Sequence, residues 1–145
     1  MKPHAAMLAA IALLSASCAG TGNPRTAGHP GAQADIPSPR VHFPTGSDVV
    51  AKKDRRGVEK NARWMIDNPG AVVVLEGHCD ERGSDRLNME LGDRRARSVK
   101  AKLLEEGVGG DRMVMVVSYG KMRPLDPRHT REAWRKNRRV EFIVR

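Results

Sequence analysis

The stretch GHCDERGSD (residues 77–85) and the stretch LNMELGDRRARSV that follows it (residues 87–99) decide the fold of this chain. The first places Asp80 on a glycine-flanked turn directly after an apolar run, and the second places Arg95 on a helix with an apolar stripe. A carboxylate suits an ammonium group, and the planar guanidinium of arginine suits a carboxylate through paired hydrogen bonds. This pair of charges therefore indicates a site for a zwitterion, a ligand that carries both charges.

The segments around this stretch alternate between strand and helix patterns. Continuous apolar and β-branched residues predict strands at residues 41–43, 72–75, 113–117 and 140–144. Residues 118–120 are expected to close the third strand, and residues 132–136 to form one or two helical turns. This alternation predicts an α/β fold with a single mixed β-sheet and helices packed against it, in the order βαβαβ plus a C-terminal strand.

Two long helices are expected between these strands. A side-chain cap is expected at Ser47 or Asp48 for the first helix and at Ser84 or Asp85 for the second, which Gly107 ends. The expected apolar positions are Val50, Val58, Ala62, Met65 and Ile66 in the first helix and Leu87, Leu91, Val99, Leu103 and Leu104 in the second.

Arg95 interrupts the apolar stripe of the second helix, because Leu91 lies one turn before it and Val99 one turn after it. We expect its stem to follow the edge of the core and its guanidinium to reach the rim beside Asp80. The alternative is an intramolecular Asp80–Arg95 salt bridge, which at a protein surface contributes only about 0 to 1 kcal/mol.

The N-terminal residues have the pattern of an export signal. Lys2 precedes an uncharged apolar run at residues 5–16, which is shorter than the ~20 residues that span a bilayer. Small residues lead to Cys18, as in lipoprotein signals in which this cysteine is lipidated and becomes the mature N-terminus. We therefore expect residues 1–17 to be a signal peptide and Cys18 to anchor the chain to the outer membrane on its periplasmic face. The alternative is an ordinary cleaved signal that leaves Cys18 as a free thiol.

Residues 18–40 are rich in glycine and proline and poor in large apolar side chains, which predicts a flexible linker before a folded domain at residues 41–145. The net charge of +9 would allow nucleic acid, anionic lipid or an acidic polymer as a partner. Export from the cytoplasm argues against nucleic acid, and most of the basic side chains are expected to form a solvated face.

No catalytic set, cofactor motif or metal site is expected. No serine lies in a nucleophile elbow. His78, Cys79 and Asp80 are adjacent, and neighbouring side chains on an extended segment point to opposite faces, so they do not easily share one ion. We therefore expect a binding protein and no enzyme.

The turn and helix motifs resemble those of the outer-membrane protein A-like domains of peptidoglycan-associated lipoproteins (Pal) from Gram-negative bacteria. The resemblance extends from about Val41 to Arg145 and includes SYGK at residues 118–121 and KNRRV at residues 136–140. It implies that Asp80 and Arg95 bind the meso-diaminopimelate of the peptidoglycan stem peptide. The weaker pocket candidates are Glu81, Arg82, Ser84, Asn88 and Leu91. Arg138 and Arg139 are expected to brace the fold rather than to contact ligand.

The resemblance implies an outer-membrane lipoprotein that tethers the membrane to peptidoglycan within the Tol–Pal system, with TolB and possibly other Tol proteins as partners. The alternative is a general wall anchor of the same domain family that does not bind TolB. A third possibility is an accessory to a wall hydrolase, which would need a nucleophile or a metal that the sequence does not offer.

Overall fold

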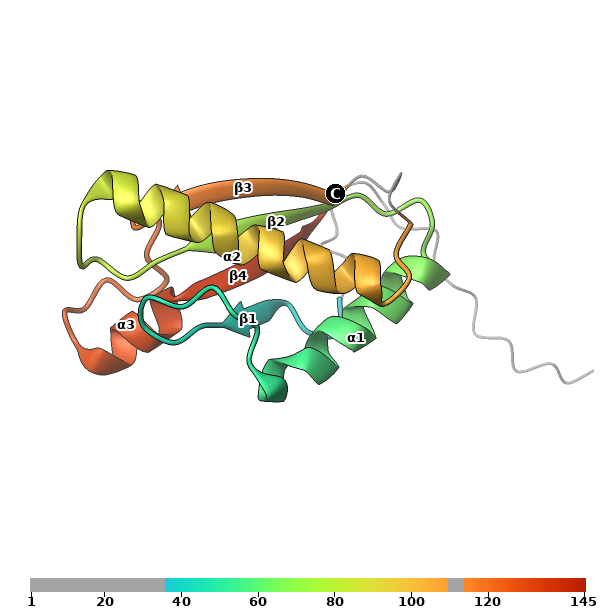
Figure 1. The fold of residues 1–145 in the computed structure, drawn as a ribbon, viewed down its shortest axis with the longest axis horizontal. Helices are drawn as coiled ribbons and strands as arrows, with labels where there is room; N and C mark the ends of the chain where they lie inside the picture. The colour runs from blue at the N-terminus through green and yellow to red at the C-terminus, as the bar shows by residue number, and fades with distance from the viewer. Residues whose placement is uncertain (1–35, 110–113) are drawn as a thin grey trace, which may run out of the picture.

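The computed structural model describes residues 36–109 and 114–145. Its elements are β1 (Arg40–His42), α1 (Lys52–Asp67), β2 (Val73–His78), α2 (Asp85–Glu105), β3 (Val114–Gly120), α3 (Arg131–Asn137) and β4 (Arg139–Val144), as Figure 1 shows. The signal peptide at residues 1–17, Cys18 and the linker up to residue 35 lie outside the described residues. None of the described helices combines the length and the apolar character that crossing a membrane requires.

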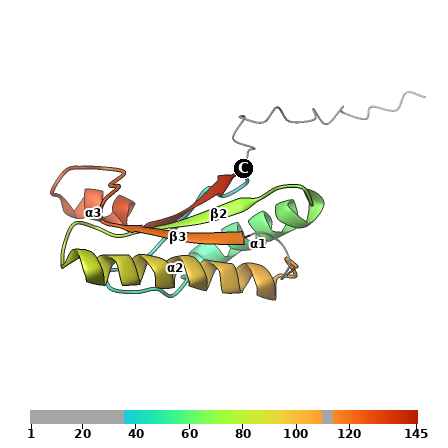
Figure 2. The ribbon, with the colours of Figure 1, turned by 90° about the horizontal axis from the view of Figure 1, so that it is seen from above.

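The strands form one mixed sheet in the order β1-β4-β2-β3. The last strand in the chain, β4, lies between β1 and β2 and runs antiparallel to both, whereas β2 and β3 are parallel. Helix α2 runs along one face of the sheet, as the view in Figure 2 shows. The predicted α/β class with a single mixed sheet is confirmed. Because β4 is central, its first residues lie beside the end of β2 and the turn that follows it.

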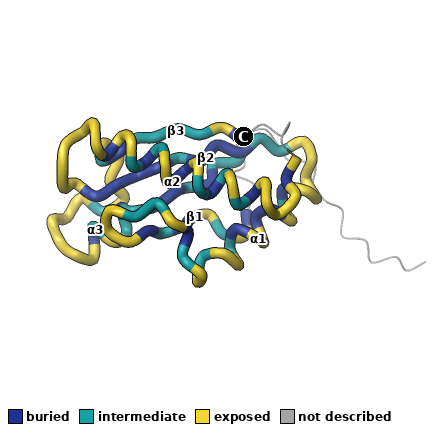
Figure 3. Tube along the Cα trace, in the orientation of Figure 1, coloured by how far each residue is buried: buried dark blue, intermediate teal, exposed yellow. Residues whose placement is uncertain are grey.

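The core lies between the sheet and helices α1 and α2. Figure 3 shows buried stretches along the central strands and exposed loops at both ends of the molecule. The sheet contributes Val73, Leu75, Val140 and Phe142, and the helices contribute Val58, Ala62, Met65, Ala96, Val99 and Leu103. Removing these side chains from water is the main term that stabilises the fold.

Helix α2 approaches β2 closely because two glycines face each other. A Cβ atom on Gly77 would lie only 2.0 Å from the backbone oxygen of Gly92, and one on Gly92 would lie 2.3 Å from Oγ of Ser118. The absence of side chains at these two positions therefore sets the distance between helix and sheet, and with it the position of every side chain that α2 directs toward the site.

Gly77→Ala is expected to destabilise the domain by about 3 kcal/mol, because the new methyl group overlaps the helix backbone and cannot be accommodated by a rotamer change. Gly70→Ala is the matched control, because a Cβ at Gly70 would meet nothing within 4 Å. Urea unfolding of the two variants measures the difference. A Gly77→Ala variant as stable as Gly70→Ala would contradict the close approach.

The helix boundaries differ from the expectation at one end. The predicted caps Ser47 and Asp48 are wrong for the first helix, because α1 begins after Ala51, which makes no side-chain cap hydrogen bond. The hydroxyl of Ser47 instead accepts from the backbone N–H of Val49, and its carbonyl accepts from Arg95, so this segment is held outside the helix. Ser84 caps α2 as expected and accepts from the backbone N–H of Leu87.

Three residues expected in the apolar stripes are exposed: Ile66, Leu87 and Leu104. The buried face of α2 is rotated from the expected one and contains Asn88, Gly92, Arg95, Ala96, Val99 and Leu103. Gly92 brings the backbone of α2 close to β2 at one end of this face, while Val99 and Leu103 are buried further along it as expected.

The strands follow the predicted pattern with shifted ends. β2 continues to His78, and β3 includes the residues that were expected to close it, up to Gly120. Met113, the expected start of that strand, lies outside the described residues. Ile36 is part of the core, and Ser38 exchanges two hydrogen bonds with the side chain of Asn61. The folded part therefore includes residues 36–40, which the sequence assigned to the linker.

Candidate functional site

A cavity of about 320 Å³ opens where the turn after β2, the start of α2 and the loop after β1 meet. Its lining residues are Thr45, Gly46, Cys79, Asp80, Arg82, Gly83, Leu87, Asn88, Leu91, Arg95 and Arg138. Asp80 and Arg95, predicted from the sequence as the two charged ends of the site, thus lie in one cavity. Among the weaker candidates Arg82, Asn88 and Leu91 line it, whereas Glu81 and Ser84 do not.

Asp80 does not pair with Arg95, so the alternative of a salt bridge between them is wrong. Its carboxylate accepts from the backbone N–H of Arg82 at 3.2 Å, from the Arg82 side chain at 3.0 and 2.7 Å, and from Nη1 of Arg138 at 3.0 Å. Burial opposes ionisation of Asp80, but the hydrogen bonds from Arg82 and Arg138 outweigh it and hold the pKa of Asp80 below its usual range. Asp80 is therefore ionised at neutral pH.

Arg95 is fully buried, with 0% of its surface exposed, so the expected position of its guanidinium at the rim is wrong. Its Nε donates to the carbonyl of Ser47 at 2.8 Å, Nη2 to that of Pro44 at 3.0 Å, and Nη1 to that of His78 at 2.9 Å. Nη1 also lies 3.3 Å from Sγ of Cys79. A guanidinium has five N–H groups, and these three carbonyls and the sulfur account for four of them. The fifth, on Nη2, has no acceptor among the described residues and is available to the cavity.

Arg95 therefore joins its own helix, α2, to two segments that are distant from it in the sequence. The carbonyls of Pro44 and Ser47 belong to the loop after β1, and that of His78 ends β2. Burial lowers the pKa of Arg95, yet arginine remains charged at any physiological pH. Its guanidinium lies 5.2 Å from the ring centroid of Phe43, which adds a cation–π contact.

Arg138 is a further candidate site residue, which was expected from the sequence only to brace the fold. It does brace the fold, because its Nε donates to the carbonyl of Phe43 at 3.0 Å. It also lines the cavity, pairs with Asp80, and has 12% of its side chain exposed. Its Nη2 has no acceptor among the described residues, so Arg138 offers two further N–H groups to a bound anion. The KNRRV motif was the available signal, but only the pairing of β4 beside β2 places it at the site.

Residues around the turn hold Asp80 in place. The Asn88 side chain donates to the carbonyls of Arg82 and Ser84 at 2.9 and 3.1 Å. Glu81 points away from the cavity toward α3, where its carboxylate accepts from Nε1 of Trp134 at 2.7 Å and contacts the His129 ring. Arg82 stacks over the ring of Trp134, with 4.3 Å between its Cζ and the ring centroid. The turn is thus fixed from both sides, although the side chains of Glu81 and Arg82 within it remain 39% and 44% exposed.

Cys79 is buried, and burial raises the pKa of its thiol, so it is neutral at physiological pH. Its Sγ lies 3.4 Å from the carbonyl of Asn88 and 3.3 Å from Nη1 of Arg95. A hydroxyl can make both contacts, because it donates and accepts.

Cys79→Thr is therefore expected to change the free energy of unfolding by less than about 1 kcal/mol and to leave ligand binding unchanged. Chemical unfolding and binding assays of Cys79→Thr beside the wild type measure this. A loss of about 2 kcal/mol or more would show that the thiol itself has a structural or chemical role.

Comparisons with known proteins cover most of this chain. The OmpA family pattern matches residues 42–138. A peptidoglycan-associated lipoprotein of Rhizobium meliloti is 34% identical over 129 residues, which are 87% of this chain and 73% of that protein. One from Pseudomonas aeruginosa is 50% identical over 101 residues, 70% of this chain and 59% of that protein.

Solved structures with the same fold include the peptidoglycan-associated lipoprotein from Burkholderia pseudomallei. It superposes with a TM-score of 0.71 at 29% identity, and the match covers 74% of this chain and 90% of that one. The C-terminal domain of Helicobacter pylori MotB has a TM-score of 0.67 at 24% identity, over 73% of this chain and 83% of that one. At this identity the second likeness shows the fold alone.

Proposed function

The chain belongs to the OmpA family, and from this membership and the cavity at Asp80 we propose that it binds peptidoglycan non-covalently. The single observation that carries the proposal is the composition of the cavity. One ionised carboxylate faces unused N–H groups of two arginines, so the cavity has an acceptor for a cation and donors for an anion. The likeness to peptidoglycan-associated lipoproteins supports the same ligand.

The ligand group that fits these charges is the free end of meso-diaminopimelate, which carries an ammonium and a carboxylate on one carbon. In our proposal Asp80 accepts from the ammonium, and the carboxylate receives hydrogen bonds from Nη2 of Arg138 and the remaining N–H of Arg95. A stem peptide with lysine at this position lacks the carboxylate and would leave the arginine donors unpaired, which disfavours it.

Binding must change the contacts of Arg82. The carboxylate of Asp80 already receives four hydrogen bonds, three of them from Arg82, and a carboxylate has about four acceptor positions. We propose that the ligand ammonium replaces the Arg82 side chain, which is 44% exposed, while Arg138 stays in place. Arg82 then occupies, in the free protein, the position of the ligand cation.

Arg82→Gln is accordingly expected to bind diaminopimelate stem peptide as tightly as the wild type or up to about fivefold more tightly, since an exposed ion pair no longer competes. Calorimetric titration of both proteins with the same peptide measures the change. A tenfold or greater loss of affinity would instead make Arg82 a ligand contact.

The direct test of the proposed function is co-sedimentation of the purified protein with isolated sacculi. Binding to sacculi with diaminopimelate stems and not to those with lysine stems is the expected result. Equal binding to both types would refute recognition through the zwitterion.

We further propose that Cys18 carries lipid and anchors the domain to the periplasmic face of the outer membrane. The support is the apolar run followed by small residues before Cys18, together with the likeness to named lipoproteins. Mass spectrometry of the membrane-extracted protein should find acyl groups on Cys18. A mature chain that begins at another residue would contradict this part of the proposal.

Membership of the Tol–Pal system is proposed from the likeness to Pal proteins alone. If TolB uses the same surface as the wall, soluble stem peptide added to a preformed complex with the host's TolB should release the domain. Absence of TolB binding would favour the alternative of a general wall anchor.

A further inference from the structure

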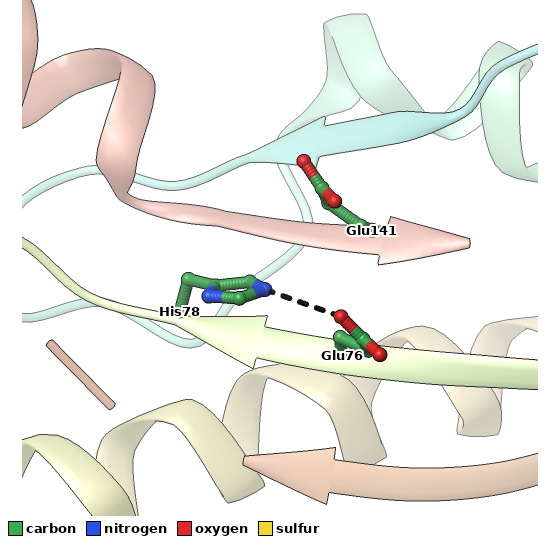
Figure 4. Close-up of side chains that lie close together, drawn as sticks. All are labelled: Glu76, His78 and Glu141. Carbon is green, nitrogen blue, oxygen red and sulfur yellow. Dashed lines mark ion pairs between the residues drawn. The ribbon is translucent and has the colours of Figure 1, made fainter. Parts of the chain in front are cut away.

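A histidine and two glutamates gather on the face of the sheet opposite α2. Gly77 touches α2, so its neighbours Glu76 and His78 on β2 both point to the other face. Glu141 on β4 is paired directly with Glu76 in the antiparallel register. One ligand atom from each of the three residues lies within 4.8 Å of the other two. Figure 4 shows Glu76 and His78 side by side on β2 and Glu141 on the neighbouring strand β4.

We propose that Glu76, His78 and Glu141 bind a divalent transition-metal ion of the Zn²⁺ class. The site is separate from the cavity at Asp80, since none of the three residues lines that cavity.

The state of His78 is the first observation that points to a ligand. Only 1% of the residue surface is exposed, and neither ring nitrogen has a hydrogen-bond partner of good geometry among the described residues. Nε2 lies 3.8 Å from Oε2 of Glu76, as the dashed line in Figure 4 marks, which is too long for a hydrogen bond. Buried polar groups without partners are rare and costly in folded proteins. An ion between His78 and Glu76 would satisfy the imidazole.

The charges of the two glutamates are the second observation. Like charges directly opposite each other on neighbouring strands are destabilising. The negative charge of Glu141 is compensated by two arginines, because its Oε1 accepts from Nε of Arg40 and Nε of Arg139, both at 2.8 Å. Glu76 has no lysine or arginine at ion-pair distance in the described part of the chain. A bound cation would supply that missing charge, and the two arginines would hold Glu141 in its orientation, as outer partners do for metal ligands.

The donor set selects the class of ion. One imidazole nitrogen and two carboxylate oxygens suit Zn²⁺ and its neighbours among the transition metals, whereas Ca²⁺ and Mg²⁺ prefer oxygen alone and Cu⁺ prefers sulfur. Zinc bonds to these atoms are about 2.0 to 2.2 Å long, so rotation of the Glu76 side chain, which no lysine or arginine of the described residues holds, would bring its oxygens toward an ion beside His78 and Glu141 and leave a fourth position for water. This set cannot be recognised from the order of residues, because Glu141 comes beside the other two only through the pairing of β4 with β2.

The test uses the whole chain after treatment with EDTA. Calorimetric titration with zinc chloride should show binding, and the melting temperature should rise by about 10 °C when free zinc is near one hundred times Kd. His78→Gln and Glu76→Gln should each weaken zinc binding by about tenfold or more. His129→Gln is the matched control, because His129 also contacts a glutamate, Glu81, but lies outside the set.

Glu76→Gln separates metal binding from a structural role. In EDTA this variant should be at least as stable as the wild type, because the repulsion with Glu141 is removed, and it should lose the stabilisation by zinc. The proposal is overturned if the wild type shows no zinc-dependent rise in melting temperature. It is equally overturned if the rise is unchanged in Glu76→Gln and His78→Gln, which would place the zinc on other residues.

Discussion

Arg95→Ala is expected to lower the free energy of unfolding by about 3 to 5 kcal/mol, a large part of the stability of a small domain. The reason is that the buried guanidinium ties α2 to β2 and to the loop after β1. Without it the buried carbonyl of His78 and the part-buried carbonyl of Ser47 lose this donor, whereas the carbonyl of Pro44 keeps the backbone N–H of Ser47, and a buried acceptor left unpaired costs about 1 to 3 kcal/mol. The truncated side chain also leaves a void beside the core.

Arg94→Ala is the matched control, since Arg94 directly precedes Arg95 on α2, has 54% of its side chain exposed and forms an exposed ion pair with Asp48. We expect it to cost no more than about 1 kcal/mol. Thermal and urea unfolding of the two variants provide the comparison. Equal stability of Arg95→Ala and Arg94→Ala would show that the loop after β1 does not depend on the buried guanidinium.

This expectation replaces the one made from the sequence, in which Arg95 sat at the rim and contributed little to folding. A loss of wall binding by Arg95→Ala is therefore no measure of ligand contact unless the variant is shown to be folded. Arg95→Lys keeps the charge and most of the volume, but a lysine ammonium cannot reach all three carbonyls with the planar geometry of arginine. Its stability should lie between those of the wild type and Arg95→Ala.

Asp80→Asn is expected to reduce affinity for diaminopimelate stem peptide by about 2 to 5 kcal/mol, which is roughly 30-fold to several thousandfold in Kd. The substitution keeps the shape of the side chain and removes the charge that the ligand ammonium needs. The free energy of unfolding should change less than the affinity does, because the Arg82 side chain is 44% exposed and Arg138 keeps its hydrogen bond to the carbonyl of Phe43. Asp80 therefore tests the site more cleanly than Arg95 does.

Calorimetric titration with the peptide, beside thermal unfolding of the same samples, measures both effects. Asp93→Asn serves as the control, because Asp93 also pairs with an arginine, Arg97, on the exposed side of α2. Retained affinity in Asp80→Asn together with a large fall in melting temperature would mean that the carboxylate is structural. The proposed contact with the ligand ammonium would then be wrong.

The network around Asp80 explains how a charged site can be both rigid and open to ligand. Oδ1 of Asp80 accepts from the backbone N–H of the turn and Oδ2 accepts from Arg138, whereas the Arg82 side chain, which is 44% exposed, donates one hydrogen bond to each oxygen. A preformed anion with one replaceable partner loses little conformational freedom on binding, which favours affinity.

The sequence by itself determined the fold class, the Ser84 cap and the placement of Asp80 and Arg95 near each other. These follow from local signals, because strand and helix periods, turn glycines and capping residues act over a few positions. The turn after β2 and the helix that follows it are consecutive in the chain. Their two charged residues meet in one cavity for that reason.

Only the tertiary structure decided which partners these residues have. Pairing of β4 between β1 and β2 brings Arg138 to Asp80 and Glu141 to Glu76. Neither contact can be predicted from the sequence, because the residues are far apart in the chain. The contact of Gly77 with Gly92 sets the distance between α2 and β2, and the guanidinium of Arg95 is buried against backbone carbonyls and does not pair with Asp80. Strand register and helix distance arise from packing between distant segments, so the sequence pattern of any one segment does not contain them.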